Sequence, residues 1–206
     1  MVPLYDRKRL GQTSIEASPV GFGASPMGDV FANIDENDAV AAVSLALKSG
    51  INLFDTSPFY GLTKSETVLG KALGQVQKEI PSSDFVISTK VGRYGQTEFD
   101  FSSKRILSSI DESCKRLNVD YLVIVFCHDI EFGDINVVLN ESIPTLQKLK
   151  ESGKVRAIGV SGYPLSIFDS VSNSSSIPLD VILSYCHLNL QDPSLLDKIP
   201  EWTSRN

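Results

Sequence analysis

The stretch Tyr-Leu-Val-Ile-Val-Phe-Cys-His-Asp, residues 121–129, contains the strongest signal for the fold class. Residues 122–126 are continuously apolar and rich in β-branched and aromatic side chains, which is typical of a parallel strand covered on both faces. After Cys127, two ionisable residues, His128 and Asp129, follow this run. Because neighbouring parallel strands need a long crossover between them, this stretch predicts βα units rather than hairpins.

Outward from this strand, short β-rich runs alternate with amphipathic stretches. The predicted helix before it, residues 103–117, places Ile106, Ile110 and Cys114 on one face. The predicted helix after it, residues 137–152, contains Pro144, which marks either a kink or the beginning of the regular helix. The other predicted strands are residues 18–22, 52–56, 85–89, 155–160 and 181–185, and the other predicted helices are residues 36–49, 64–73, 164–171 and 194–199.

The order is therefore β-α, repeated about six times, which places the chain in the α/β class with a parallel sheet. A complete (β/α)8 barrel of the TIM type needs about 250 residues, whereas the chain has 206. We expect an incomplete barrel of about six βα units, without the last two, as one domain over residues 1–206. An open, doubly wound sheet is the alternative on topology alone.

Composition limits which classes of partner and which cellular compartment we expect for the chain. The net charge is −6, from 19 Lys and Arg against 25 Asp and Glu, which argues against nucleic acid as a main partner. No run approaches the roughly 18–20 apolar residues that span a membrane, and residues 1–11 do not resemble a secretory signal. The three cysteines are scattered, so we expect small core residues in a reducing, cytoplasmic setting rather than disulfides. The oligomeric state stays open.

Ionisable residues terminate three successive strands of the predicted sheet. Asp55 ends the second strand and is followed by Tyr60, Lys90 ends the third, and His128 ends the fourth. The carboxyl ends of barrel strands meet at one rim, so these side chains should converge there. Each residue alone is more often a structural feature than a catalytic one, but the joint pattern predicts an active site.

This set has a chemical logic. A tyrosine with its ordinary pKa of about 10 is a poor proton donor and acceptor near neutrality, and a neighbouring buried lysine would lower that pKa. An aspartate would keep the buried lysine charge tolerable, and a histidine would hydrogen-bond the reacting oxygen. The set suits interconversion of a carbonyl and an alcohol, with a cofactor supplying or accepting the hydride.

Competing motifs are incomplete. Gly21-Phe22-Gly23 is only the front of a dinucleotide-binding G-x-G-x-x-G motif, and residues 159–163 lack the last glycine of a hydrolase G-x-S-x-G elbow. A hydrolase is therefore disfavoured. His128 and His187 have no neighbours at metal-ligand spacing, so we expect no metal site.

The chain resembles the aldo-keto reductases. The resemblance is carried by Asp-Thr-Ser-Pro-Phe-Tyr-Gly at 55–61, with Ser-Glu at 65–66 and Leu-Gly at 69–70, and by Lys90 and His128 at strand ends. Gly-Phe-Gly-Ala at 21–24 fits as well. Within the family, the segments at 21–26, 92–94, 127–133 and 184–187 resemble the L-galactose dehydrogenase branch, and D-arabinose dehydrogenases are near relatives.

The resemblance implies roles for the same residues. Tyr60 would be the acid/base, Lys90 its neighbour, Asp55 the partner of Lys90, and His128 the group that orients the sugar oxygen. The implied reaction is oxidation of a small sugar at C1 to its lactone, with NAD as the expected cofactor and NADP left open. Ser161, Asp55 and the turn of Gly23, Ala24 and Ser25 would contact the cofactor.

Two departures from the family pattern stand out. The residue after Ser161 is Gly162 where the family has Asn, and no Gln is evident around Leu183 and Ser184. The family's last two strands, which carry much of the cofactor site, and its two closing helices are absent from residues 1–206. A weakly active or inactive chain is therefore expected as one outcome, and a reductase-like cofactor-binding or regulatory subunit is the alternative to an enzyme. An open-sheet binding module is a weaker third.

Overall fold

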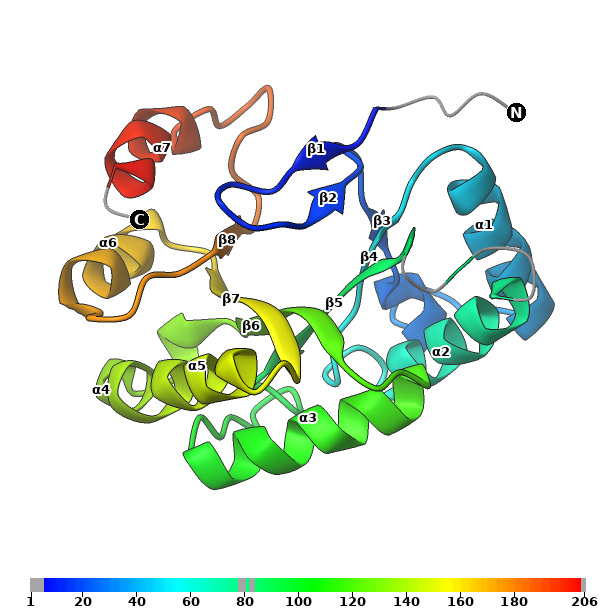
Figure 1. Ribbon diagram of the computed structural model, residues 1–206, viewed down its shortest axis with the longest axis horizontal. Coiled ribbons are helices and arrows are strands. Elements are labelled where there is room, and N and C mark those ends of the chain that lie inside the picture. Colours follow the sequence, from blue (N-terminus) through cyan, green and yellow to red (C-terminus); the bar gives the residue numbers. More distant parts are fainter. Residues whose placement is uncertain (1–5, 78–80, 82–83, 205–206) are drawn as a thin grey trace.

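A single parallel sheet organises the molecule, as the computed structural model of the chain shows for residues 6–77, 81 and 84–204 (Figure 1). The sheet has six strands in the order β3-β4-β5-β6-β7-β8, so every strand pairs with its neighbour in sequence. The sheet curls into a half-barrel of the (β/α)8 type. A doubly wound sheet reverses its strand order at a switch point, and that alternative is therefore wrong.

The strands and helices agree closely with the predicted alternation. The barrel strands are β3 (Phe22–Gly23), β4 (Leu53–Asp55), β5 (Val86–Val91), β6 (Leu122–Cys127), β7 (Val155–Gly162) and β8 (Val181–Ser184). The helices are α1 (Glu36–Lys48), α2 (Lys64–Val76), α3 (Ser103–Leu117), α4 (Ile135–Val137), α5 (Ile143–Glu151), α6 (Leu165–Ser174) and α7 (Leu195–Thr203). Two short 3-10 turns, η1 (Ser25–Gly28) and η3 (Ile130–Phe132), follow β3 and β6.

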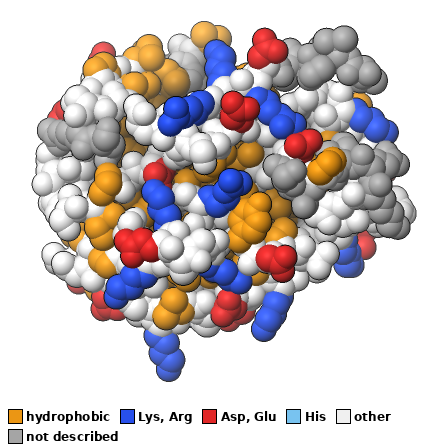
Figure 2. All heavy atoms as spheres, viewed as in Figure 1, with side chains coloured by type: hydrophobic (Ala, Val, Ile, Leu, Met, Phe, Trp, Pro, Cys, Tyr) orange, Lys and Arg blue, Asp and Glu red, His pale blue; other side chains and the backbone are white. Residues whose placement is uncertain are grey.

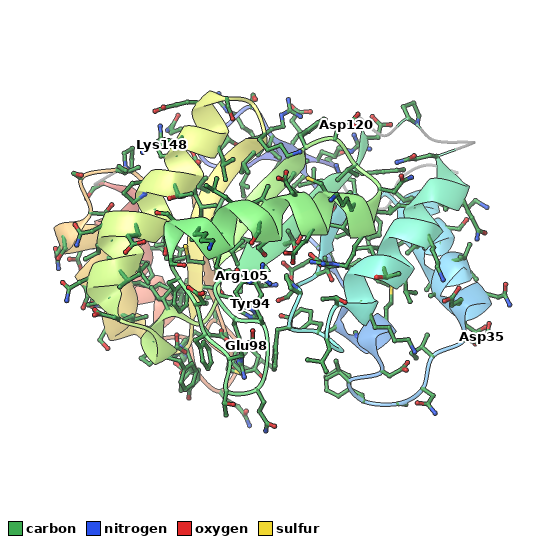
Figure 3. The ribbon with its side chains drawn as sticks, turned by 90° about the horizontal axis from the view of Figure 1, so that it is seen from below. Asp35, Tyr94, Glu98, Arg105, Asp120 and Lys148 are labelled. Carbon is green, nitrogen blue, oxygen red and sulfur yellow. The ribbon has the colours of Figure 1, made fainter. Side chains whose placement is uncertain are left out.

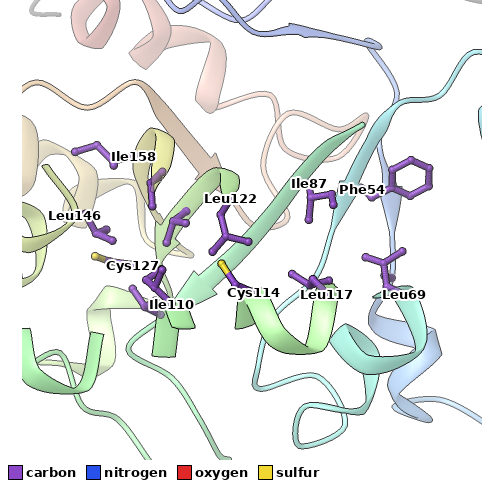
Figure 4. Packing of buried hydrophobic residues seen from close by; sticks show 14 of the residues in the cluster. Phe54, Leu69, Ile87, Ile110, Cys114, Leu117, Leu122, Cys127, Leu146 and Ile158 are labelled. Carbon is purple, nitrogen blue, oxygen red and sulfur yellow. The ribbon is translucent and has the colours of Figure 1, made fainter. Parts of the chain in front are cut away.

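The main core lies between the sheet and the helices that cover its outer face (Figure 4). The fully buried side chains there include Phe54 of β4, Leu69 of α2, Ile110 of α3 and Leu146 of α5. A second, smaller cluster with Val86, Ile124, Phe126 and Ala157 fills the inner side of the curled sheet. Apolar side chains on both faces explain why residues 122–126 show no polar alternation.

Helices α2 and α3 approach each other closely at Gly70. A Cβ atom on Gly70 would lie 2.2 Å from the carbonyl oxygen of Arg116 and 2.8 Å from Cα of Leu117. Backbone atoms cannot yield as flexible side chains do, so the interhelical distance depends on the missing side chain. One turn later in α2, a Cβ atom on Gly74 would meet only Asn118 Nδ2, at 3.8 Å.

This difference gives a matched pair of substitutions. Gly70→Ala should lower the free energy of unfolding by about 1–3 kcal/mol, because the helices must move apart. Gly74→Ala should leave it unchanged or raise it by up to about 1 kcal/mol, because alanine favours the helix. Urea denaturation of the two variants measures both values, and equal effects would contradict the close-approach argument.

The first barrel strand is shorter and later than residues 18–22. The strand β3 begins at Phe22. The backbone before it forms hydrogen bonds with the side chains of Ser18 and Asn52 instead of with a neighbouring strand. The Ser18 N–H donates to Asn52 Oδ1 at 2.7 Å, and the Ser18 hydroxyl donates to the Val20 carbonyl at 2.7 Å. Pro19 has no N–H for a strand ladder.

An antiparallel hairpin of β1 (Lys8–Arg9) and β2 (Glu16–Ala17) precedes the barrel and was not predicted. Its tight loop is fastened by the Arg9 guanidinium, which donates to the carbonyls of Gln12 and Thr13. Ile15 and Ala17 are buried and belong to the inner cluster of the half-barrel. The hairpin therefore packs against the inner side of the sheet.

Three smaller features test other expectations. Pro144 lies in the first turn of α5, after a π-helical segment, η4 (Val138–Ser142). Of the two predicted outcomes, it therefore marks the beginning of the regular helix. The last helix is longer than the predicted residues 194–199, because α7 continues to Thr203 and buries Trp202 against Phe168. The prediction of three core cysteines holds for Cys114 and Cys127 but not for Cys186, which is exposed.

The surface in Figure 2 carries Lys and Arg side chains interspersed with Asp and Glu, with apolar side chains between them. Within the described residues, none of the helices combines the length and apolarity that crossing a membrane requires.

Candidate active site

A buried ion pair lies at the carboxyl ends of β4 and β5. Lys90 Nζ is 2.6 Å from Asp55 Oδ2 and donates a second hydrogen bond, of 2.8 Å, to the carbonyl of Thr56. The lysine side chain is only 1% exposed, whereas Asp55 is 25% exposed. The other carboxylate oxygen of Asp55 accepts a 2.7 Å hydrogen bond from the Ser88 hydroxyl. Asp55 is thus held by both neighbours and orients the lysine.

Tyr60 is carried by the loop between β4 and α2, and this loop is docked on η1. A Cβ atom on Gly61 would lie 2.0 Å from the carbonyl oxygen of Gly28, and Gly61 has a φ of 61°. Both the close contact and the left-handed backbone require glycine. Ser65 adds to the docking by donating to the Ala24 carbonyl at 2.6 Å. The position of Tyr60 therefore depends on backbone contacts rather than on the tyrosine itself.

The Tyr60 ring lies close to both the lysine and the histidine. Lys90 Nζ is 4.8 Å from the centre of the ring. The His128 ring is 5.8 Å from it, centre to centre, at an interplanar angle of 89°. The structure therefore brings together all four side chains predicted to converge: Asp55, Tyr60, Lys90 and His128. Their roles in catalysis stay a prediction.

His128, directly after β6, is 4% exposed, and each of its two ring nitrogens has a polar neighbour. Its Nδ1 is 3.1 Å from the Ser57 hydroxyl, and its Nε2 is 3.4 Å from Asp129 Oδ2. Asp129 has a left-handed backbone, with a φ of 51°, and its N–H donates to Ser161 Oγ at 3.3 Å. Strained, non-glycine backbone of this kind is concentrated at functional sites.

Arg93 completes the polar wall beside the histidine. Its Nη1 is 2.5 Å from Asp129 Oδ2, and its guanidinium lies over the Phe59 ring, 3.8 Å from the centre. The loop that carries Arg93 is held by Tyr94, whose phenol oxygen accepts a 3.2 Å hydrogen bond from the Gly92 N–H. Arg105 of α3 lies over the Tyr94 ring at 3.8 Å, and Figure 3 shows the two side chains next to each other.

Burial dominates the electrostatics of Tyr60. It raises the pKa of the phenol above its ordinary value, and the Lys90 cation opposes this without cancelling it. The predicted effect of Lys90 is therefore present, since the ammonium lowers the phenol pKa, but desolvation outweighs it and the pKa of Tyr60 stays above its ordinary value. For Lys90, burial acts to lower the pKa, but Asp55 and Tyr60 outweigh it and leave the pKa raised. The lysine is a permanent cation.

His128 behaves in the opposite way. Burial, together with the Lys90 and Arg93 cations, holds the pKa of the imidazole well below its usual range. The ring is therefore neutral at physiological pH. A neutral imidazole has one N–H donor and one acceptor nitrogen.

This shift predicts a pH dependence of stability. In the unfolded chain a histidine titrates near pH 6.5. Below that pH the unfolded state binds a proton at this imidazole, whereas folded His128 stays neutral. The stabilisation is complete above pH 6.5 and is lost as the pH falls, with a slope of at most about 1.4 kcal/mol per pH unit. Urea denaturation between pH 7.5 and roughly 5.5 should show this slope in the His187→Gln control and a smaller one in His128→Gln. Equal slopes would contradict a depressed pKa.

The residues predicted to contact a cofactor line the same rim. Gly23 pairs in register with Asp55, and a Cβ atom there would have nothing within 4 Å, so the space in front of it is open. Ala24 is buried, and Ser25 begins η1. Ser161, 1% exposed, ends β7 beside Asp129.

Two polar atoms without hydrogen-bond partners flank Gly162. Glu131 Oε2 and Ser184 Oγ are buried and, among the described residues, unpartnered. A Cβ atom on Gly162 would come within 2.6 Å of Glu131 Oε2, and Ser184 pairs with Gly162 in the sheet register. These atoms lie where the family's Asn and Gln are missing. An acceptor and a hydroxyl fit the carboxamide of a nicotinamide ring, which offers N–H donors and a carbonyl.

Several site residues had no predicted role. Ser57, Ser88 and the Thr56 carbonyl hold the catalytic candidates in place, and Arg93 and Asp129 form the polar wall. Asp129 was visible at a strand end, and residues 92–94 carried part of the family resemblance, but neither signal specified a contact. Such contacts depend on how neighbouring βα loops fold over the rim.

Fold and site together define a half-barrel of the (β/α)8 type in which Asp55, Tyr60, Lys90 and His128 gather at the carboxyl rim. The sequence model of the Aldo/keto reductase family matches residues 19–200, and the chain belongs to that family. It is 51% identical to L-galactose dehydrogenase of Arabidopsis thaliana over 96% of its length, and 36% identical to D-arabinose 1-dehydrogenase of Saccharomyces cerevisiae over 87%. It spans 61% and 55% of these two relatives.

Solved structures give the same result. The holo form of an aldo-keto reductase from Bacillus halodurans superimposes with a TM-score of 0.80 at 25% identity. The match covers 98% of this chain and 63% of that structure.

Proposed function

We propose that the chain carries the acid–base half of an NAD-dependent dehydrogenase that oxidises an aldose, L-galactose above all, at C1 to its lactone. The observation that carries the proposal is the Tyr60 ring, which lies close to both the buried Lys90, paired with Asp55, and the neutral imidazole of His128. A nicotinamide cofactor, when bound, accepts the hydride from C1.

The chain's own residues handle the proton and the oxygen. Tyr60 takes the proton of the C1 hydroxyl as the C1–O bond becomes a carbonyl, and the Lys90 cation stabilises the phenolate that does so. His128, through its N–H, holds the reacting oxygen. Asp55 keeps the lysine charged and in place. Because the raised pKa of Tyr60 limits the phenolate fraction, sugar oxidation should become faster as the pH rises above neutrality.

The sugar is supported by relatives and by the site. Three similar proteins, at 51%, 36% and 28% identity, are dehydrogenases of L-galactose, D-arabinose and D-threo-aldoses. The Arg93–Asp129 pair next to His128 is a polar wall, with both side chains under 20% exposed. Such a wall suits a substrate with several hydroxyl groups better than an apolar aldehyde.

Two measurements test the proposal. Formation of NADH from NAD and L-galactose, compared with D-arabinose and a simple alcohol, should show turnover that prefers the aldoses. Calorimetric titration with NAD and NADP measures cofactor affinity separately. Cofactor binding without turnover would favour a reductase-like binding or regulatory subunit, and absence of both would contradict the proposal for this chain.

A further inference from the structure

Ser57 is the hydrogen-bond neighbour of one of the two ring nitrogens of His128. Ser57 is completely buried, in the loop just after β4. Its hydroxyl oxygen accepts a 3.1 Å hydrogen bond from the Phe59 N–H and lies 3.1 Å from His128 Nδ1. Within the part of the chain that the structure describes, no other side-chain or carbonyl acceptor is within reach of this hydroxyl.

A serine hydroxyl has one hydrogen to donate. If Nδ1 carried the imidazole proton, the Ser57 oxygen would accept two hydrogen bonds, and its own buried hydrogen would have no acceptor. A buried donor left in this way costs about 1–3 kcal/mol. If Nδ1 is unprotonated, the Ser57 hydroxyl donates to it and every group is satisfied.

We propose that Ser57 is a positioning residue that fixes His128 in the tautomer with its proton on Nε2. The Nε2–H then lies on the side of Asp129 Oδ2, 3.4 Å away, which is too long for a good hydrogen bond. The donor is therefore held in place but only loosely used, and it is available to the oxygen of a substrate. The neutral state of the imidazole supports this, because a doubly protonated ring would have no acceptor for Ser57.

The inference deepens the proposed function, because a fixed Nε2–H donor is what the sugar oxygen would meet. Its test needs neither sugar nor cofactor, so the two proposals can fail separately. The chain contains only two histidines, His128 and His187, and the His187→Gln variant leaves a single imidazole to observe.

Nitrogen-15 NMR of the ring in the folded His187→Gln protein gives the direct answer. We expect a protonated Nε2 and an unprotonated, hydrogen-bonded Nδ1 at neutral pH. A protonated Nδ1 would overturn the proposal at once, whatever happens to any serine variant.

Serine variants in the same background separate positioning from packing. Ser57→Ala should move the Nδ1 signal toward that of a nitrogen without a hydrogen bond, and Ser57→Thr, which keeps the hydroxyl, should restore it. Ser113→Ala removes a hydroxyl from another completely buried serine, in α3, and should leave both ring signals unchanged. Unchanged ring signals in Ser57→Ala would likewise contradict the assigned role.

Discussion

Tyr60→Phe is expected to reduce the turnover of aldose oxidation by about 10²–10⁴-fold, the range in which general acid–base groups contribute. The substitution removes one oxygen atom and keeps the ring. The perpendicular packing of the ring on His128 and its contact with the Lys90 ammonium should therefore survive. The loss should appear in kcat, whereas KM and the free energy of unfolding should change little.

The appropriate control is Tyr121→Phe. Tyr121 is an exposed tyrosine just before β6, at the opposite end of the strand from His128. The Tyr121→Phe variant also loses one phenol oxygen, but at a position far from the rim. Its steady-state NADH production should equal that of the unmodified chain. A Tyr60→Phe protein that folds and retains more than about a tenth of the turnover would show that another group exchanges the proton.

Replacement of Glu66 is expected to have the largest effect on stability. Glu66 of α2 is completely buried. It accepts a 2.6 Å hydrogen bond from the Thr89 hydroxyl of β5 and another of 2.6 Å from Arg116 Nε of α3. One carboxylate thus links two helices and the strand that carries Lys90. Removing one partner of a buried ion pair leaves the other charge uncompensated, at a cost of about 3–5 kcal/mol.

The experiment measures the free energy of unfolding of three variants by urea denaturation, each relative to the unmodified chain. Glu66→Leu should lose about 3–5 kcal/mol, because Arg116 then keeps only its longer, 3.8 Å pairing with Glu112. Glu66→Leu combined with Arg116→Leu should lose less, because the poorly compensated charge is removed as well. Glu36→Leu is the matched control, since Glu36 pairs with Lys71 across α1 and α2 with both side chains more than half exposed. Its loss should stay below about 1 kcal/mol. A similar small loss for Glu66→Leu would mean that Arg116 turns outward to solvent.

The parts of the fold that were predictable are those set by local pattern. Strands such as β6 are apolar on both faces, and α1 and α5 end just before Gly50 and Gly153, so the alternation could be read without coordinates. The predicted end of the second helix at residue 73 was wrong, because α2 continues through Gly74 to Val76. The rim could be predicted because parallel strands place their carboxyl ends together, which put Asp55, Lys90 and His128 on one edge.

What could not be predicted depends on contacts between distant segments. The hairpin of β1 and β2 has strands of only two residues, three of them exposed, and is held by Arg9 and by packing of Ile15 inside the half-barrel. The direction in which the pKa of Tyr60 shifts depends on the balance between burial and the neighbouring Lys90 cation, and this balance is visible only in the folded structure. Glu66 reads as an ordinary helix residue, and only the positions of Thr89 and Arg116 show that it is an internal charge.

The sequential strand order has a consequence for how the chain acquires its structure. Each strand from β4 onward hydrogen-bonds to the strand made just before it, with one crossover between them. One crossover is the shortest connection that parallel neighbours allow, and synthesis delivers the amino-terminal units first. The half-barrel can therefore grow one unit at a time on the ribosome, each new strand finding its template already in place.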